Sequence, residues 1–159
     1  MSSDLIDTAR RILGAARRKP SQADLRRAVS TAYYAMFHTL ARTCADEIAG
    51  RSKRSAPEWA RVYRALEHGR SRLALNEIRA GKGFAGGVSA RLADFCDTLE
   101  KFKQRRNEAD YNPAPLKLNR IGVNLLIGEA ETAIDAFQKQ APADQRRALA
   151  FACVVRLRA

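Results

Sequence analysis

Two stretches of this sequence set polar and ionisable side chains beside apolar ones at helical spacing. In the first, Ser30, Tyr34 and His38 recur every fourth position, next to an apolar series that runs from Leu25 to Cys44. Side chains at this spacing lie along one edge of a helix. One interpretation of a hydroxyl, a phenol and an imidazole in one row is a polar site able to bind a ligand and exchange protons. The other is an ordinary row at the edge of the core whose hydrogen bonds are satisfied within the protein.

The second stretch continues an apolar helical face with two opposite charges. The apolar series from Leu92 to Phe102 predicts a core-facing stripe, and at 3.6 residues per turn the stripe continues at Arg106 and Asp110. Residues four apart on a helix can pair. An arginine on a core face carries a desolvation cost that a surface position avoids. We therefore expect Arg106 and Asp110 at the centre of a site, unless the stripe runs past the core into solvent.

Other kinds of site have weaker support. The two histidines, His38 and His68, are far apart and have no cysteine nearby, so we expect no metal site and no cofactor. The letters of Gly81 to Gly86 match G-x-G-x-x-G, but no strand is expected before them. This segment is interpreted as a loop, with a weak phosphate contact through Lys82 as the alternative.

The elements that must position these residues are helices, because apolar residues recur every three or four positions and no stretch alternates with period two. We expect an all-α chain of five or six helices in one domain over residues 1–159, with a core at about 4–140 and a basic C-terminal helix over 142–159. Gly69 is a potential break in the third helix. The expected spans are about 4–18, 21–50, 55–80, 89–111, 118–140 and 142 onward, with Ser21 and Ser89 as caps.

The charge balance points to an anionic partner. The 29 Lys and Arg residues outnumber the 17 Asp and Glu residues, which gives a net charge of +12. RNA or DNA is the first expectation, an acidic protein the second and a membrane surface the third. Two clusters could contact phosphates: the loop from Arg51 to Arg54, and the arginines of the last helix. These arginines are Arg146, Arg147, Arg156 and Arg158.

Cysteine usage and hydropathy indicate a reducing compartment. Cys44, Cys96 and Cys153 are scattered among apolar helical positions, so we expect them to be small buried hydrophobes. The first residues lack the apolar core of a signal peptide, and no apolar run is long enough to cross a membrane. A cytoplasmic protein without a membrane partner is expected.

Two segments together resemble the HEPN family. The stretch from Arg27 to His38 reads RAVSTAYYAMFH and is similar to the second-helix signature of that family, with its paired tyrosines and following Phe-His. The stretch from Arg106 to Tyr111 reads RNEADY and resembles a variant of the functional motif, R-x-x-A-D-Y. The resemblance covers about residues 1–140, and the two segments occur in the order that the family shows.

This resemblance implies an up-and-down bundle of four to five helices that dimerises through the motif helices. Many members are metal-independent ribonucleases, often toxins of toxin–antitoxin pairs whose partner is a nucleotidyltransferase antitoxin. Their active motif is an arginine followed four to six residues later by a histidine, and here Tyr111 stands where that histidine is expected. His68 follows Arg61 and Arg64 but lies outside the matching helix, and we interpret that pairing as a coincidence.

Metal-free RNA cleavage needs a base, an acid and a cation for the charge on phosphorus. Arg106 is the expected cation. Tyr111, with an ordinary pKa of about 10, is a poor base, and His38 is better tuned but must reach across from the second helix. The expected catalytic residues are Arg106, Asp110, Tyr111 and His38. The expected RNA-binding residues are Ser30, Tyr34, Arg105 and Asn107. The alternative is a non-catalytic helical adaptor that docks a nucleotidyltransferase or another protein.

Overall fold

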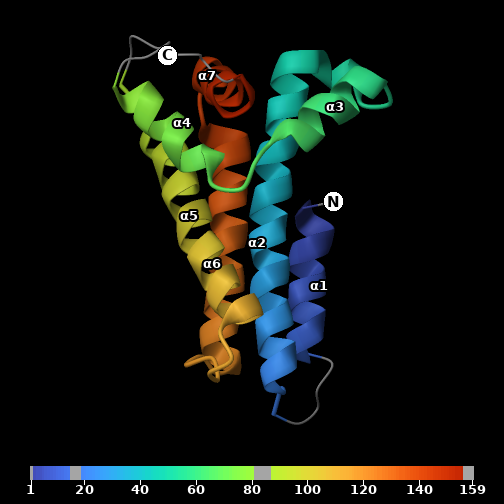
Figure 1. The fold of residues 1–159 in the computed structure, drawn as a ribbon, viewed down its shortest axis with the longest axis vertical. Coiled ribbons are helices and arrows are strands. Elements are labelled where there is room, and N and C mark those ends of the chain that lie inside the picture. The colour runs from blue at the N-terminus through green and yellow to red at the C-terminus, as the bar shows by residue number, and fades with distance from the viewer. Residues whose placement is uncertain (1, 15–18, 81–86, 156–159) are drawn as a thin grey trace.

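The computed structural model describes residues 2–14, 19–80 and 87–155, and these form seven α-helices and no strand (Figure 1). The expected all-α class is therefore confirmed. The helices are α1 (Ser2–Gly14), α2 (Gln22–Ala45), α3 (Pro57–Ala65), α4 (Arg70–Arg79), α5 (Ala90–Tyr111), α6 (Arg120–Gln140) and α7 (Ala143–Val154). A π-helical turn, η1 (Asp46–Gly50), and a 3-10 turn, η2 (Arg51–Lys53), follow α2.

Side-chain caps start the long helices where the sequence predicts them. Ser21 Oγ accepts from the backbone nitrogen of Asp24 at 3.1 Å, and Asp24 Oδ2 accepts from the backbone nitrogen of Ser21 at 3.0 Å. This capping box satisfies two donors at the start of α2. Ser89 caps α5 and Asn119 caps α6 through a single contact each, because their side chains accept from the backbone nitrogens of Leu92 and Gly122. These caps place the starts of α2 and α5, and hence the register of the site residues that they carry.

The described residues hold more α-helices than the five or six expected. The reason is the link Leu66–Gly69, which divides the expected third helix into α3 and α4. Gly69 has a φ of 91°, a conformation that glycine adopts without steric cost. The segment Gly81–Gly86, the expected end of the first helix, and Arg156 and Arg158 of the last helix lie outside the described residues.

Helix α2 lies at the centre of the structure and packs against α1, α5 and α6, which run alongside it, while α3, α4 and α7 gather at one end (Figure 1). The largest core side chains are aromatic, and Phe95 of α5 stacks on Phe137 of α6 with ring centroids 4.1 Å apart. The three cysteines are buried and form no disulfide, as expected. Among the described helices, none has the length and hydropathy needed to span a membrane.

Candidate functional site

Helix α5 carries an ion pair on the side that faces the core. Phe102 and Ala109 are buried, and Arg106 lies between them with 19% of its side chain exposed. Its Nε is buried and lies 2.7 Å from Oδ2 of Asp110, at an angle outside hydrogen-bond geometry, so the contact is an ion pair. The predicted continuation of the stripe thus places Arg106 and Asp110 at the edge of the core, between the interior and solvent.

The predicted polar row of α2 meets this ion pair directly. Ser30 Oγ donates to Oδ1 of Asp110 at 2.5 Å, and Nη2 of Arg106 donates to the hydroxyl oxygen of Tyr34 at 3.2 Å. Because Ser30 and Tyr34 are one helical turn apart, they match the spacing of their two partners on α5. The structure therefore brings together four of the residues singled out from the sequence, across the contact between α2 and α5.

Three tyrosine rings surround the guanidinium of Arg106. Its central carbon lies 5.9 Å from the ring centroid of Tyr33, 5.8 Å from that of Tyr34 and 5.4 Å from that of Tyr111. A guanidinium at this distance from an aromatic face is attracted by the ring. Tyr111 is exposed and contacts Arg106 from the solvent side, so its position suits a stacking surface for a ligand.

The two neighbours of Arg106 on α5 differ in what they contact. Asn107 Oδ1 accepts a hydrogen bond of 3.4 Å from Nη1 of Arg106, so Asn107 lies at the rim of the site. Arg105, expected from the sequence to bind RNA, pairs instead with Glu108 at 3.2 Å. Arg105 is therefore outside the cluster around Arg106.

Arg26, which the sequence analysis did not single out, holds the end of α5 in place. Its Nη1 donates to the carbonyl oxygens of Ala109 at 2.6 Å and Asn112 at 2.8 Å, and its Nη2 donates to that of Ala114 at 2.6 Å. Cationic side chains satisfy the last carbonyls of a helix in this way. Arg26 is therefore a positioning residue for the helix end that carries Asp110 and Tyr111.

His38, the third member of the polar row, contacts α3. Its Nδ1 lies 2.6 Å from the hydroxyl oxygen of Tyr63, and its ring stacks on the Tyr63 ring at 5.9 Å and on the Tyr34 ring at 6.1 Å. Burial lowers the pKa of His38, because the charged form of a histidine is disfavoured away from water. The imidazole is therefore mainly neutral at pH 7.

His68, which was not among the expected site residues, also lies beside this cluster. Its Nδ1 lies 2.5 Å from the hydroxyl oxygen of Tyr33, and its ring stacks on Phe37 with centroids 4.2 Å apart. Burial lowers the pKa of His68, and the positive charges of Arg106 and Lys103 lower it further. His68 was expected to have no meaningful pairing with Arg61 or Arg64, and its contacts are instead with Tyr33 and Phe37 of α2, where the link Leu66–Gly69 places it.

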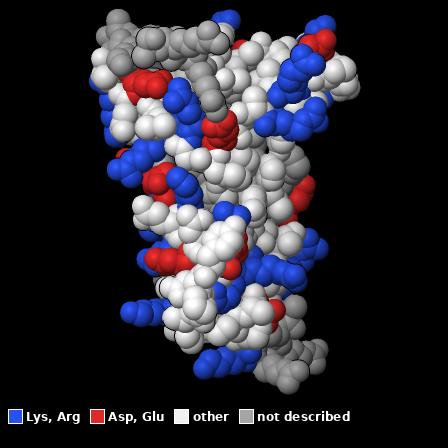
Figure 2. Space-filling view, viewed as in Figure 1, with Lys and Arg blue, Asp and Glu red and all other residues white. Residues whose placement is uncertain are grey.

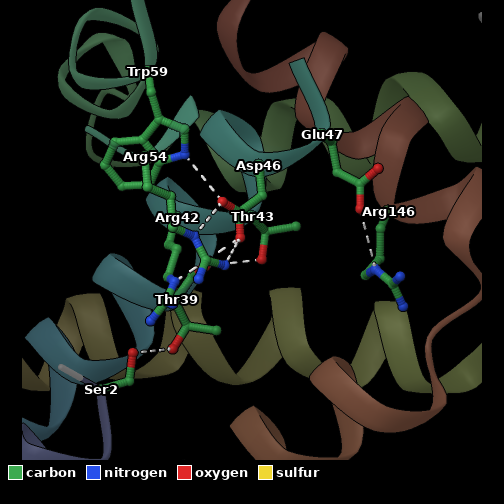
Figure 3. A network of polar contacts seen from close by, with 9 residues as sticks. All are labelled: Ser2, Thr39, Arg42, Thr43, Asp46, Glu47, Arg54, Trp59 and Arg146. Atoms are coloured by element: carbon green, nitrogen blue, oxygen red, sulfur yellow. Dashed lines mark hydrogen bonds and ion pairs between the residues drawn. The ribbon is translucent and has the colours of Figure 1, made fainter. Parts of the chain in front are cut away.

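The basic residues that were expected to contact phosphates fall into two groups. Arg54 donates to both carboxylate oxygens of Asp46, whose side chain is 8% exposed and also accepts from Nε1 of Trp59 at 3.0 Å, and Arg146 lies 3.6 Å from Glu47 (Figure 3). Burial alone would raise the pKa of Asp46, but the hydrogen bonds from Arg54 and Trp59 lower it below its ordinary value. Arg54 and Arg146 are thus occupied by internal contacts, whereas Arg51 and Lys53 are exposed.

Exposed cations continue from these two residues onto α3. Arg61 and Arg64 are exposed on that helix, and Lys and Arg side chains gather over it in the upper right of Figure 2. A groove of about 710 Å³ lies elsewhere, between the segments 19–25 and 116–121, and none of its lining residues belongs to the cluster around Arg106. The geometry therefore places the candidate site at the contact of α2 and α5, with a basic surface on α3.

Within the described part of the chain, no group of three or more His, Cys, Asp or Glu residues is arranged to hold a metal ion. Comparison of the chain with protein-family models, with curated proteins and with solved structures finds no match.

Proposed function

We propose that this protein is an RNA-directed, metal-independent endoribonuclease whose site is centred on Arg106. The observation that carries the proposal is the placement of the Arg106 guanidinium between Tyr34, Asp110 and exposed Tyr111. The imidazoles of His38 and His68 both contact the ring of the same Tyr34. A guanidinium matches the geometry of a phosphate. An imidazole is the side chain best suited to move a proton near neutral pH.

Single-stranded RNA fits this site better than a duplex does. Arg106 donates one hydrogen bond to Tyr34 and one to Asn107, which leaves further N–H groups on Nη1 and Nη2 for phosphate oxygens. Tyr111 is 71% exposed beside the guanidinium, and unpaired bases stack on exposed aromatic rings. The basic surface on η2 and α3 would attract the remaining phosphates of the strand.

The finer architecture and the partners are part of the same proposal. The side-by-side arrangement of α1, α2, α5 and α6 supports a HEPN-like bundle, and a toxin role with a nucleotidyltransferase antitoxin follows from that assignment. Ile121 and Leu125 of α6 are 71% and 70% exposed, and large apolar side chains at such exposure suit a protein interface. A homodimer formed in the cytoplasm is the assembly that we propose.

The test is cleavage of a single-stranded RNA by the purified protein in EDTA. Arg106→Ala should lower the rate about 100-fold or more, in the range found for loss of one charge-stabilising donor. Arg91→Ala is the matched control, because Arg91 is an exposed arginine of α5 that also pairs with an aspartate, Asp94, at 4.0 Å. Wild-type protein that does not cleave RNA would overturn the ribonuclease proposal, and wild-type protein that does not bind RNA either would overturn the RNA-directed role as well.

The second candidate function is a non-catalytic adaptor, and the exposed Ile121 and Leu125 are the observation that favours it. An adaptor would bind its protein partner through this patch and would be indifferent to Arg106→Ala. Light scattering at tens of micromolar tests whether this patch joins two copies of the chain, as in the proposed homodimer, or stays open for another protein, as in an adaptor. Wild type should be a dimer and Leu125→Glu a monomer, whereas a monomeric wild type would contradict the proposed assembly.

A further inference from the structure

The link Leu66–Gly69 is held against both helices of the site. Leu66 is buried in the core, which fixes the start of the link where it leaves α3 (Figure 1). At its other end, Gly69 lies so close to α5 that a Cβ built on it would be 2.6 Å from Nζ of Lys103. His68 lies between these two anchors, so its backbone has a defined place beside α2 and α5.

The His68 ring is held by contacts with three residues of α2, and its Nε2 is left without a partner among the described residues. Its Nδ1 lies 2.5 Å from the hydroxyl oxygen of Tyr33, its ring stacks on Phe37 with centroids 4.2 Å apart, and it makes an edge contact with the Tyr34 ring at 6.5 Å. Among the described residues, Nε2 makes no hydrogen bond, and His68 is exposed. Nε2 is therefore the atom that a ligand can reach.

His38 differs from His68 on both counts that matter for proton transfer. It is only partly exposed, because the Tyr63 and Tyr34 rings stack along it. In addition, the charge of Arg106 acts on His68, whereas burial is the cause of the pKa shift of His38. His68 is thus the more exposed of the two imidazoles, and the one whose charged form is disfavoured by the arginine that would hold the phosphate.

We propose that His68, and not His38, is the general base that takes the proton from the 2′-hydroxyl of an RNA strand bound at Arg106. This inference rests on the proposed function and adds the identity of the catalytic histidine. It assigns Tyr33 as the positioning residue that orients the His68 ring. The histidine absent from position 111 is thereby supplied from another segment of the chain.

The step is a transesterification. Nε2 of His68 takes the proton as the 2′-oxygen forms a bond to phosphorus, and the bond from phosphorus to the 5′-oxygen breaks. The leaving 5′-oxygen takes a proton from solvent water, and the imidazolium returns its proton to the resulting hydroxide. The products are a 2′,3′-cyclic phosphate and a 5′-hydroxyl. Arg106 stabilises the charge that accumulates on the phosphoryl oxygens.

The surroundings keep His68 in the form that this step needs. Burial raises the pKa of Tyr33 to about 12, so its phenol stays neutral and its oxygen can accept a hydrogen bond from Nδ1–H of His68, the tautomer that leaves a lone pair on Nε2. The charged and titratable groups that act on His68 are Arg106 and Lys103 from α5 and His38 from α2. All three disfavour the imidazolium, so the base is unprotonated at neutral pH.

The experiment compares His68→Ala, His68→Gln and His38→Ala on a single-stranded RNA in EDTA. Binding is measured in parallel on a 2′-O-methyl version of the strand, which cannot be cleaved this way. Both His68 variants should bind RNA and lose about 100-fold or more in cleavage rate, the usual contribution of a general base. Added imidazole should restore part of the rate in His68→Ala. Glutamine can still hydrogen-bond to Tyr33, so His68→Gln should cleave at close to the wild-type rate if the role of His68 is only structural.

The pH–rate profile provides the second readout. The acid limb of wild type should have its midpoint below about 6.5, the ordinary histidine value, and should persist in His38→Ala. If wild type cleaves but His68→Gln cleaves equally well, or if only His38→Ala removes the acid limb, the assignment of His68 is overturned and the ribonuclease proposal stands. If wild type does not cleave, the ribonuclease proposal itself fails and the assignment of His68 fails with it.

Discussion

Arg106 and His68 contact the same buried side chain, that of Tyr33, from two different elements. The guanidinium carbon lies 5.9 Å from the Tyr33 ring centroid, and Nδ1 of His68 lies 2.5 Å from its hydroxyl oxygen. Tyr33 itself is 1% exposed and packed in the core of α2. One buried side chain therefore connects Arg106 with His68.

Tyr33→Phe should separate orientation of His68 from binding of RNA. The variant keeps the ring beside Arg106 and removes only the hydroxyl that contacts His68. One hydrogen bond contributes about 1 kcal/mol, so cleavage should fall about fivefold while affinity for the uncleavable RNA changes little. Parallel loss of affinity and rate would instead indicate that the hydroxyl supports the whole site.

Arg106→Ala should affect activity far more than stability. The Arg106 and Asp110 side chains are 19% and 30% exposed, so the ion pair is partly solvated and its loss should cost about 1 kcal/mol of unfolding free energy. Asp110→Asn should weaken cleavage less than Arg106→Ala, since Asp110 orients the arginine. Urea denaturation measures the stability of each variant. A loss of several kcal/mol for Arg106→Ala would indicate that the ion pair with Asp110 serves mainly to stabilise the bundle.

The two groups of basic residues should respond differently to alanine. Arg51→Ala and Lys53→Ala should leave stability unchanged, weaken RNA affinity, and each lower the slope of log K against log salt by about 1. Arg54→Ala should instead lower the free energy of unfolding by about 2 kcal/mol, because the largely covered carboxylate of Asp46 loses its two hydrogen bonds from Arg54. RNA affinity that stays flat between low and physiological salt would remove nucleic acid as the main partner.

The helical periodicity was sufficient to place Ser30 and Tyr34 on one edge of their helix, and Arg106 and Asp110 on one face of theirs. Both pairs lie on regular helices whose starts are fixed by Ser21 and Ser89, so residue spacing translates directly into position. The place of His68 could not be predicted in this way. It lies on a link, and the path of a link depends on long-range packing, here of Leu66 and Gly69, that periodicity does not describe. The internal pairing of Arg54 has the same origin, since a run of charge does not reveal its partners.

Acidification should destabilise the protein through its two histidines. Burial lowers the pKa of both His38 and His68 in the folded state, whereas an unfolded histidine titrates at about 6.5. Between the lowered values and 6.5 the unfolded chain binds more protons, so the free energy of unfolding falls as the pH falls through that window. Urea denaturation at several pH values measures this slope. The double variant His38→Gln, His68→Gln should have a smaller slope, and equal slopes would contradict the prediction.

Gly69→Ala should impair cleavage through the position of the link. Gly69 has a φ of 91°, and an alanine there costs about 1–2 kcal/mol because its Cβ approaches the following carbonyl oxygen. The new Cβ would also lie 2.6 Å from Nζ and 3.4 Å from Cε of Lys103. The lysine end is flexible and can move aside, so the protein should still fold, at a cost close to that of the backbone alone.

The relief of that strain is expected to move the link, and His68 with it. Cleavage by Gly69→Ala should therefore fall more than the loss of stability explains, while binding of the uncleavable RNA is kept. Gly128→Ala is the matched control, because a Cβ at Gly128 meets no atom within 4 Å and alanine favours a helix. Gly69→Asn should recover part of the rate if the backbone conformation is the cause, since asparagine tolerates positive φ better than alanine. Cleavage by Gly69→Ala at the wild-type rate would mean that the link tolerates the change without moving His68.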